Sequence, residues 1–341
     1  MDLLPSKEQE EIVASAAAFL ATALPTQRTR QLISEASNVD AKAWLAAADL
    51  GWFALGLPSD LGGVGCGLAD EVLLFREIGR SLAGGPFLAT TLAARVAAYG
   101  GNSQLCSEIS LGGRVGLGVL GPESTLDPGG VVGTLHVVDG DDTELILVAT
   151  HERAALFTQA DLGELVALEC IDPTTRLARA TTAGAAPVVA VAADVDPVAL
   201  RGTALVAAEL TGIAEATAVL AAEHAKNRIQ FGRPIGVNQA VKHPCADMAV
   251  RAELALAQTT VAALALDEGR TDAELQCLNA LVVAADAAER NAAGTVQVLG
   301  GMGFTFEHDT NLYVKRAFLL AQLLGPVRPL LARLVLLPGP Q

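Results

Sequence analysis

The hydrophobic residues of this chain follow three successive patterns, and this limits the possible folds more than any other feature. In residues 1–110 apolar side chains recur at helical spacing, behind a Ser6 and Gln9 capping pair. From about 111 to 197 short β-branched runs are separated by Gly, Asp and Pro, which predicts strands. Helical spacing then returns. We therefore expect an α+β protein with an N-terminal helical domain (1–110), a middle small β-barrel or sandwich (111–197) and a C-terminal four-helix bundle domain (198–341).

Individual elements follow from these patterns and from the Gly and Pro residues that interrupt them. The first block predicts helices over 40–50, 68–83 and 87–99, and the last predicts long helices over 199–226, 237–268, 271–299 and 309–335. The strand-like runs are 114–121, 131–140, 144–150, 153–159 and 186–195.

Composition narrows the range of partners and compartments. The formal charge is −15 with five cysteines and the pI is about 4.7, so the general surface repels nucleic acid and anionic membranes. The scattered cysteines show no metal-ligand or disulfide spacing, which favours a reducing, cytoplasmic setting without a metal site. The acidic N-terminal stretch does not resemble a signal peptide, and charges or turn residues interrupt the apolar runs. We expect no membrane association.

A small basic segment, "NRIQFGRPIGVNQAVKH" at 227–243, stands out from the acidic background. Arg228 follows a long predicted helix, where its guanidinium could bind phosphate oxygens in bidentate fashion. Phe231 could cover a flat ring such as adenine. Taken alone, the segment favours a solvated arginine in a turn between helices.

A glycine cluster, "VQVLGGMGF" at 296–304, follows another long predicted helix. Glycines here would allow a ligand to approach the backbone closely, although most such clusters only end helices. No strand precedes it, as a dinucleotide-binding Gly-x-Gly-x-x-Gly motif requires, and the Gly-Lys-Ser/Thr of a phosphate loop is missing.

Together these segments resemble the acyl-CoA dehydrogenase family. "RIQFGRPIGVNQAVKHPCADM" is similar to its Arg-x-x-Phe-Gly segment, "QVLGGMGFTFEHDTNLYVKRA" to its Gln-x-x-Gly-Gly-x-Gly segment, and "LPSDLGGVGCGLADEVLLFREIGR" at 57–80 to its N-terminal helical motif. The resemblance spans nearly the whole chain and includes the order of the three blocks. It implies FAD-dependent α,β-dehydrogenation of an acyl-CoA thioester, in which a carboxylate removes the α-proton and the flavin accepts the β-hydride.

In that family the FAD lies between two subunits, and one subunit holds the nucleotide tail of its neighbour's cofactor. The resemblance implies that Arg228 pairs with the pyrophosphate and that other residues contact the adenosine or complete the cradle. These other residues are Gln230, Phe231, Asn238, Gln239, Gln297, Gly300 and Gly301.

The residues with which the family holds the flavin ring and supplies the catalytic base have no counterpart at the corresponding positions of this chain. The segment 117–130 lacks the family's Gly-Ser-Asp, and "ILVAT" stands where a strand with a tryptophan is expected. Leu324 and Gly202 occupy the two positions where members carry the catalytic Glu, and Pro326 replaces a Thr. We therefore expect no catalytic residue in this chain.

Two other acids, Glu209 and Glu215, lie on the helix of Gly202 and are expected to be solvated rather than to act as a relocated base. Three histidines, His224, His243 and His308, lack a matching acid or nucleophile and are expected to be ordinary polar residues.

These absences indicate a non-catalytic subunit that completes the FAD site of a longer, Glu-bearing acyl-CoA dehydrogenase subunit, as a dimer pair or an α2β2 heterotetramer. The chain resembles the short subunits of actinobacterial heterotetrameric enzymes acting on steroid-derived CoA thioesters. The implied partners are acyl-CoA and an electron-transfer flavoprotein. Two alternatives remain: a self-sufficient homomeric acyl-CoA dehydrogenase with a relocated Glu, and a flavin-free binding or scaffold protein.

The last predicted helix, 309–335, carries more leucine than one solvated helix needs. Its leucines could form intrachain core. We expect much of this surface, including Leu330 and Leu331, to pack in a subunit interface.

Overall fold

The computed structural model describes residues 3–325 and 327–339. The chain forms two compact units. The helical unit comprises Met1–Thr26, Val72–Ala83 and Thr203–Gln341, and the mixed unit comprises Gln27–Glu71 and Gly84–Gly202. Along the chain, helices are followed by a sheet and then by helices, which confirms the predicted α+β class. The division at residues 110 and 197 stays a prediction about domains.

The helices of the mixed unit lie before its sheet in sequence. They are α2 (Thr26–Leu32), α3 (Ala41–Asp49), α5 (Phe87–Tyr99) and α6 (Ser103–Ser110), with short 3-10 turns at Trp52–Ala54 and Ser59–Leu61. Helices α3 and α5 confirm the predictions, whereas the short, mostly polar α2 and α6 have too few apolar residues to show a helical period. Helix α5 is buried almost throughout and packs on β1, β4, β5 and β8.

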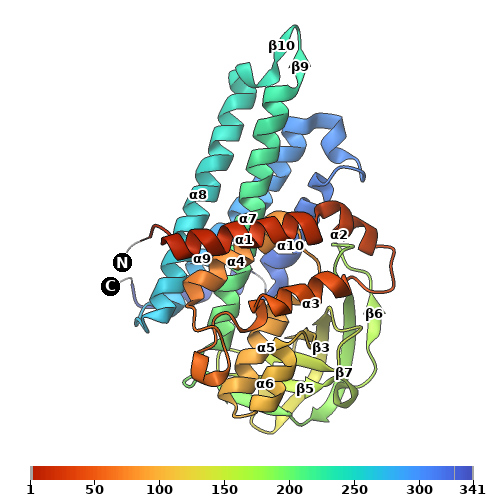
Figure 1. Ribbon diagram of the computed structural model, residues 1–341, viewed down its shortest axis with the longest axis vertical. Coiled ribbons are helices and arrows are strands. Elements are labelled where there is room, and N and C mark those ends of the chain that lie inside the picture. The colour runs from red at the N-terminus through yellow and green to blue at the C-terminus, as the bar shows by residue number, and fades with distance from the viewer. Residues whose placement is uncertain (1–2, 326, 340–341) are drawn as a thin grey trace. The chain divides into compact units, whose positions relative to one another are not determined.

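The predicted β-domain is a single eight-stranded sheet with the order β6-β7-β3-β1-β4-β5-β8, in which β2 pairs with β3 (Figure 1). Strand β1 is parallel to β4, and the other pairs are antiparallel. The predicted runs correspond to β1 (Val115–Leu120), β3 (Gly130–Val138), β4 (Leu145–Ala149), β5 (Arg153–Thr158) and β8 (Val189–Ala192). Sequence analysis missed β2 (Thr125–Asp127), β6 (Val166–Leu168) and β7 (Leu177–Ala185).

The helical unit contains the long helices of the C-terminal half. They are α7 (Val198–Asn227), α8 (Gln239–Asp267), α9 (Ala273–Leu299) and α10 (Thr310–Leu323), joined by α1 (Lys7–Ala23) and most of α4 (Leu68–Ser81). The Ser6 and Gln9 capping box before α1 is confirmed, with the Gln9 N–H 3.3 Å from the Ser6 hydroxyl. Figure 1 shows α7 and α8 running side by side, with a small β9–β10 hairpin beyond them.

Polar groups in the core fix how α7, α8 and α9 pack. The fully buried amide of Asn291 donates to the backbone carbonyls of Ala214 and Met248, each at 2.9 Å, and its oxygen accepts from Arg251. One side chain thus connects all three helices. A buried amide with three partners stabilises one particular packing, because any shift would leave a polar atom unsatisfied.

The prediction of one helix over 309–335 was wrong. Helix α10 ends at Leu323, Gly325 has a φ of +110°, and a second helix, α11, covers Val327–Leu336. The leucines of α10 are intrachain core, since Leu312, Leu320 and Leu323 are buried. On α11, by contrast, Leu331 is 46% exposed and Val335 is 85% exposed.

Two helices, α7 and α8, are long and apolar enough to cross a membrane by length and composition alone. Sequence analysis expected the apolar runs to be interrupted, but Ala-rich helices with few charges pass this criterion. The most apolar stretch of α7 is 78% buried within the protein and that of α8 is 33% buried. A core helix of a soluble protein has the same properties, so the observation is weak evidence for a membrane segment.

Candidate nucleotide site

A short hairpin follows α7 and carries the basic segment. Strand β9 (Ile229–Gln230) pairs with β10 (Arg233–Pro234), and Phe231 and Gly232 form the turn between them with φ values of +51° and +77°. The left-handed conformation is costly for a bulky residue such as phenylalanine. The Phe231 side chain is also 100% exposed. A large apolar ring presented in this way has no role in the folding of its own chain, which makes it a candidate contact for a ligand or partner.

Arg228 lies at the base of this hairpin, and its backbone is held on both sides. Its N–H donates to the His224 carbonyl, and its carbonyl accepts from the Ile235 N–H, each at 2.9 Å. The side chain is exposed, and none of the described residues forms a hydrogen bond or ion pair with its guanidinium. A fixed backbone with a free guanidinium suits bidentate binding of a phosphate group.

The residues that precede α8 are also exposed. Asn238 immediately precedes α8, and its amide donates to the Ile235 carbonyl at 3.1 Å. Gln239 is the first residue of α8, and Gln230 lies opposite Arg233 in the hairpin. These side chains can offer polar contacts to a ligand held by Arg228.

The glycine cluster is open at Gly300 and Gly301 and packed at Gly303. No heavy atom lies within 4 Å of a Cβ built at either of the first two, whereas a Cβ at Gly303 would come within 2.9 Å of the Leu299 side chain. Gly300 ends α9 with a φ of +65°, and Gln297 is exposed on the last turn of that helix. Free space over two glycines lets a ligand approach the backbone, while Gly303 serves packing.

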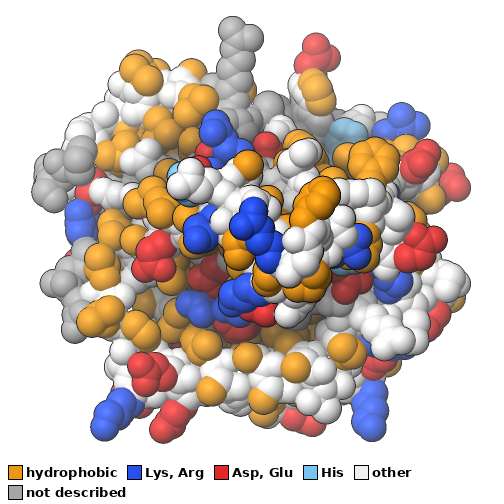
Figure 2. Space-filling model, turned by 90° about the horizontal axis from the view of Figure 1, so that it is seen from above, with side chains coloured by type: hydrophobic (Ala, Val, Ile, Leu, Met, Phe, Trp, Pro, Cys, Tyr) orange, Lys and Arg blue, Asp and Glu red, His pale blue; other side chains and the backbone are white. Residues whose placement is uncertain are grey.

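Both segments belong to the same end of the helical unit. A buried cluster of Ala218, Ala221 and Met248 joins α7 to α8, and Cys245 of α8 and Val298 of α9 pack against it. Figure 2 views this end and shows Lys and Arg side chains gathered beside hydrophobic ones near its centre. The structure therefore brings together the elements that carry all eight residues predicted to bind the nucleotide tail.

Comparison with known proteins identifies the family. The N-terminal domain model of acyl-CoA dehydrogenases matches residues 6–107, and their C-terminal domain model matches residues 200–326. The acyl-CoA dehydrogenase IpdE2 of Mycobacterium tuberculosis is 33% identical over 335 residues, covering 97% of this chain and 98% of that protein. This chain belongs to the acyl-CoA dehydrogenase family.

Other relatives point in the same direction. IpdE2 of Mycolicibacterium smegmatis is 32% identical over 96% of this chain and 98% of that protein. A chain of the ChsE4-ChsE5 complex from Mycobacterium tuberculosis has a TM-score of 0.83 at 25% identity, covering 99% of this chain and all of that one. The Tcur3481-Tcur3483 steroid acyl-CoA dehydrogenase, at 23% identity, has the same fold with a TM-score of 0.84, covering 96% of this chain and 97% of that one. The acyl-CoA dehydrogenase fold of this chain is therefore established.

Leu324 and Gly202 are the two positions that the family resemblance predicts for the catalytic Glu. Leu324 follows α10 and is partly exposed, while Pro326 lies outside the described residues. Gly202 is buried in α7, and a Cβ there would lie 3.0 Å from the Leu92 side chain within the mixed unit. A glutamate at 202 would therefore require Leu92 to move.

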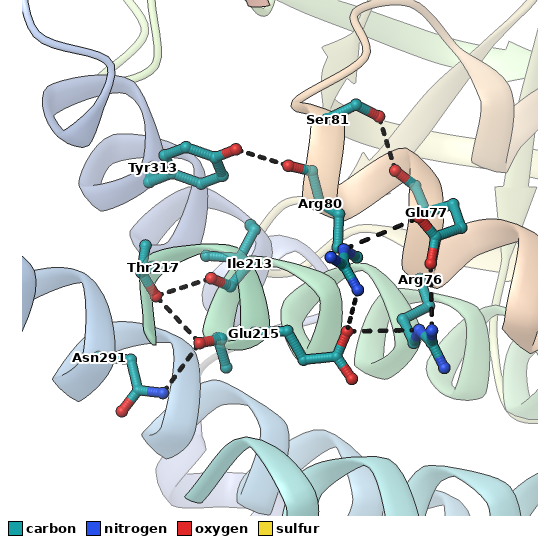
Figure 3. A network of polar contacts seen from close by, with 10 residues as sticks. Arg76, Glu77, Arg80, Ser81, Ile213, Glu215, Thr217, Asn291 and Tyr313 are labelled. Atoms are coloured by element: carbon teal, nitrogen blue, oxygen red, sulfur yellow. Dashed lines mark hydrogen bonds and ion pairs between the residues drawn. The ribbon is translucent and has the colours of Figure 1, made fainter. Parts of the chain in front are cut away.

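The expectation that Glu209 and Glu215 are solvated was wrong. Glu209 is 6% exposed, and Glu215 accepts a hydrogen bond from Arg80 at 3.2 Å and lies 3.4 Å from Arg76 Nε (Figure 3). Burial raises the pKa of Glu215, and the two arginines oppose this shift. An acid that is already paired with two arginines of α4 ties α4 to α7 and is poorly suited to act as a base.

In the segment 117–130, the Ser124 hydroxyl forms hydrogen bonds with the backbone of its own chain. Ser124 donates to the Thr134 carbonyl and accepts from the Thr134 N–H, both at 2.9 Å. This serine therefore holds its loop against β3, where the family would direct a hydroxyl at the flavin.

Proposed function

We propose that this chain is a non-catalytic subunit of a heteromeric FAD-dependent acyl-CoA dehydrogenase and completes the FAD site of a longer, Glu-bearing partner, most simply as an α2β2 heterotetramer. One observation carries the proposal. All eight predicted nucleotide-tail residues are exposed at one end of the helical unit, while a leucine, Leu324, stands at the position that the family resemblance predicts for the catalytic carboxylate. Leucine cannot accept a proton, and in this proposal the base comes from the partner chain.

The residues present fit the nucleotide half of FAD. Arg228 would hold the diphosphate, Phe231 and Gln230 would lie along the adenosine, and Gly300 and Gly301 leave space for close approach to the backbone. When bound, FAD supplies the acceptor for the hydride from the substrate β-carbon. This chain would position that cofactor and cover it from solvent.

The substrate and setting are proposed from the relatives. The Tcur3481-Tcur3483 protein is a steroid acyl-CoA dehydrogenase, which supports a steroid-derived CoA thioester. An electron-transfer flavoprotein would accept the electrons, as is usual for acyl-CoA dehydrogenases. All five cysteines are free thiols, and this favours the cytoplasm.

Co-expression with a longer, Glu-bearing acyl-CoA dehydrogenase tests the proposal. We expect flavin absorbance and dye-linked dehydrogenase activity in the purified complex, and neither in this chain alone. Turnover of an acyl-CoA by the isolated chain would contradict the proposal and favour a homomeric enzyme. A complex that never retains flavin would contradict it in favour of a scaffold.

Arg228→Ala should weaken FAD retention in that complex. Loss of a charge-assisted hydrogen-bonding group costs about 1.5–3 kcal/mol, which is roughly a tenfold to 150-fold rise in the FAD dissociation constant. The measurement is flavin released on dilution or dialysis, followed by fluorescence. Arg290→Ala, which removes an exposed arginine paired only with Asp286 on α9, is the matched control and should leave flavin retention unchanged.

Leu331→Glu should dissociate the assembly without unfolding the chain. Leu331 is exposed on α11, so a charge there costs little in the isolated chain but is costly at an apolar interface. Leu330 is half-buried, so a change there could unfold the chain as well as dissociate the assembly. Sedimentation velocity measures the state of assembly, and far-ultraviolet circular dichroism measures whether the chain stays folded. Ala332→Glu on the same helix controls for the added charge. If Leu331→Glu leaves the assembly intact, α11 does not lie in the interface.

A further inference from the structure

His224 lies beside Arg228 at the end of α7, and His308 from a later turn interacts with His224, although both histidines were expected to be ordinary polar residues. His224 lies four residues before Arg228, and the Arg228 N–H donates to the His224 carbonyl at 2.9 Å. Side chains four apart on a helix share one face. His224 is therefore placed beside the guanidinium proposed to hold the diphosphate.

His308 comes from the turn before α10 and is held in a defined orientation. Its Nδ1 accepts from the Thr310 backbone N–H at 3.2 Å and lies 2.6 Å from the Thr310 hydroxyl. A backbone N–H can only donate, so Nδ1 is an acceptor and the neutral ring carries its proton on Nε2. No described residue accepts from this Nε2–H, which leaves it available to an anion.

His224 interacts with Arg228 and with His308, and none of the three forms an ion pair with a described residue, although Glu307 and Asp309 flank His308 in the sequence. Partial burial lowers the pKa of His224, and repulsion by Arg228 and by His308 in its protonated form lowers it further. The adjacent acid, Glu223, is paired with Lys226 at 2.7 Å. The short turn Ile235–Val237, which packs on the last turn of α7 at Ala225, contributes no charged side chain. An anion placed here would relieve this repulsion.

We propose that His224 and His308 complete, with Arg228, a diphosphate site whose affinity increases as the pH falls through neutrality. The inference rests on the proposed function and adds to it a pH dependence of cofactor retention. The ligand class is a nucleoside diphosphate diester, such as the ADP half of FAD. In such a diester each phosphate has a single acidic group, which is fully ionised near neutral pH. A phosphate monoester has a second acidic group with a pKa of about 6. The pH dependence would therefore come from the protein.

The direction follows from proton linkage. The free cluster disfavours a proton on His224, and a bound dianion favours it, so binding takes up a proton near neutral pH. Affinity should be highest below the pKa of the free His224 and should decrease as pH rises toward the pKa in the complex. One linked proton gives at most about a tenfold change per pH unit.

Calorimetric titration of the full chain with ADP-ribose from pH 5.5 to 8 tests the proposal. Wild type should lose about tenfold in affinity between pH 6 and pH 8. His224→Gln should bind weakly with less than about a twofold change over that range, because its amide cannot be protonated. His224→Lys should bind tightly at both values, because its positive charge persists. His243→Gln, an exposed residue of the first turns of α8, should keep the wild-type slope.

A flat wild-type profile, or a wild-type slope in His224→Gln, would overturn the inference. Displacement of ADP-ribose by FAD and not by coenzyme A assigns the site to the cofactor tail, and the reverse would overturn that assignment. The same experiments distinguish failure of the proposed function from failure of this inference. A pH-dependent ADP-ribose site in a chain that forms no flavin-bearing complex would support the cation cluster and contradict the subunit role.

Discussion

Asp196→Ala should destabilise the mixed unit by about 3–5 kcal/mol, because it leaves the Arg95 guanidinium charged and buried without its partner. Arg95 is 3% exposed and Asp196 is 5% exposed. The pair is bidentate, with Nε to Oδ2 at 3.0 Å and Nη2 to Oδ1 at 2.7 Å, and Nη1 donates to the Gly56 carbonyl at 2.6 Å. Urea unfolding followed by circular dichroism measures the change.

Two controls separate burial from simple loss of charge. The double change Arg95→Met with Asp196→Leu removes both charges and should recover much of the loss, since an apolar pair can replace a buried ion pair. Glu223→Ala breaks the exposed pair with Lys226 and should cost less than about 1 kcal/mol. A loss of stability below about 1 kcal/mol in Asp196→Ala would show that water or another group can compensate Arg95.

Gly212→Ala should destabilise the helical unit by about 3 kcal/mol or more, because α4 and α7 touch through their backbones at this point. A Cβ at Gly212 would lie 2.0 Å from the Arg76 carbonyl oxygen, and one at Gly79 would lie 2.1 Å from that of Glu209. Backbone atoms cannot rotate away, so the helices would have to separate. Separation would also lengthen the ion pairs of Glu215 with Arg76 and Arg80.

Gly294→Ala on α9 is the matched control. The nearest neighbour of its added Cβ would be the flexible Met248 side chain, at 3.3 Å from the sulfur, while the helix gains about 1 kcal/mol in intrinsic propensity. We expect Gly294→Ala to be neutral or slightly stabilising. Equal unfolding midpoints for the two variants would show that the α4–α7 crossing can relax.

The helices and the β-domain could be predicted where the pattern was long and regular. Helices α7, α8 and α9 follow from sustained apolar spacing bounded by Gly, Pro and charged residues. Strand β7 was missed because its sequence, "LARATTAGA", has small and polar side chains, although alternate residues are buried. Its strand state depends on pairing with β3 and β6 rather than on intrinsic preference.

The nucleotide-binding role of this site stays a prediction. Motifs pointed to Arg228, Phe231 and the two glycines, because exposed cations, rings and glycines leave a local signature. Motif reasoning gave no role to His224 or His308, since neither lies in a recognisable motif. The spacing of His224 and Arg228 can be read from the sequence, whereas the interaction of His308 with His224 depends on how distant segments pack.

The sequence by itself determined the order of the helical and strand-forming blocks and the family, since these depend on residue type and spacing. That Leu324 stands in place of a catalytic acid stays a prediction. Only the tertiary structure decided that Glu215 is paired with two arginines and only partly exposed, that α10 is core while α11 is exposed, and that Arg95 and Asp196 form a buried ion pair. The physical reason is that burial and charge pairing depend on contacts between segments far apart in the chain, which local pattern does not encode.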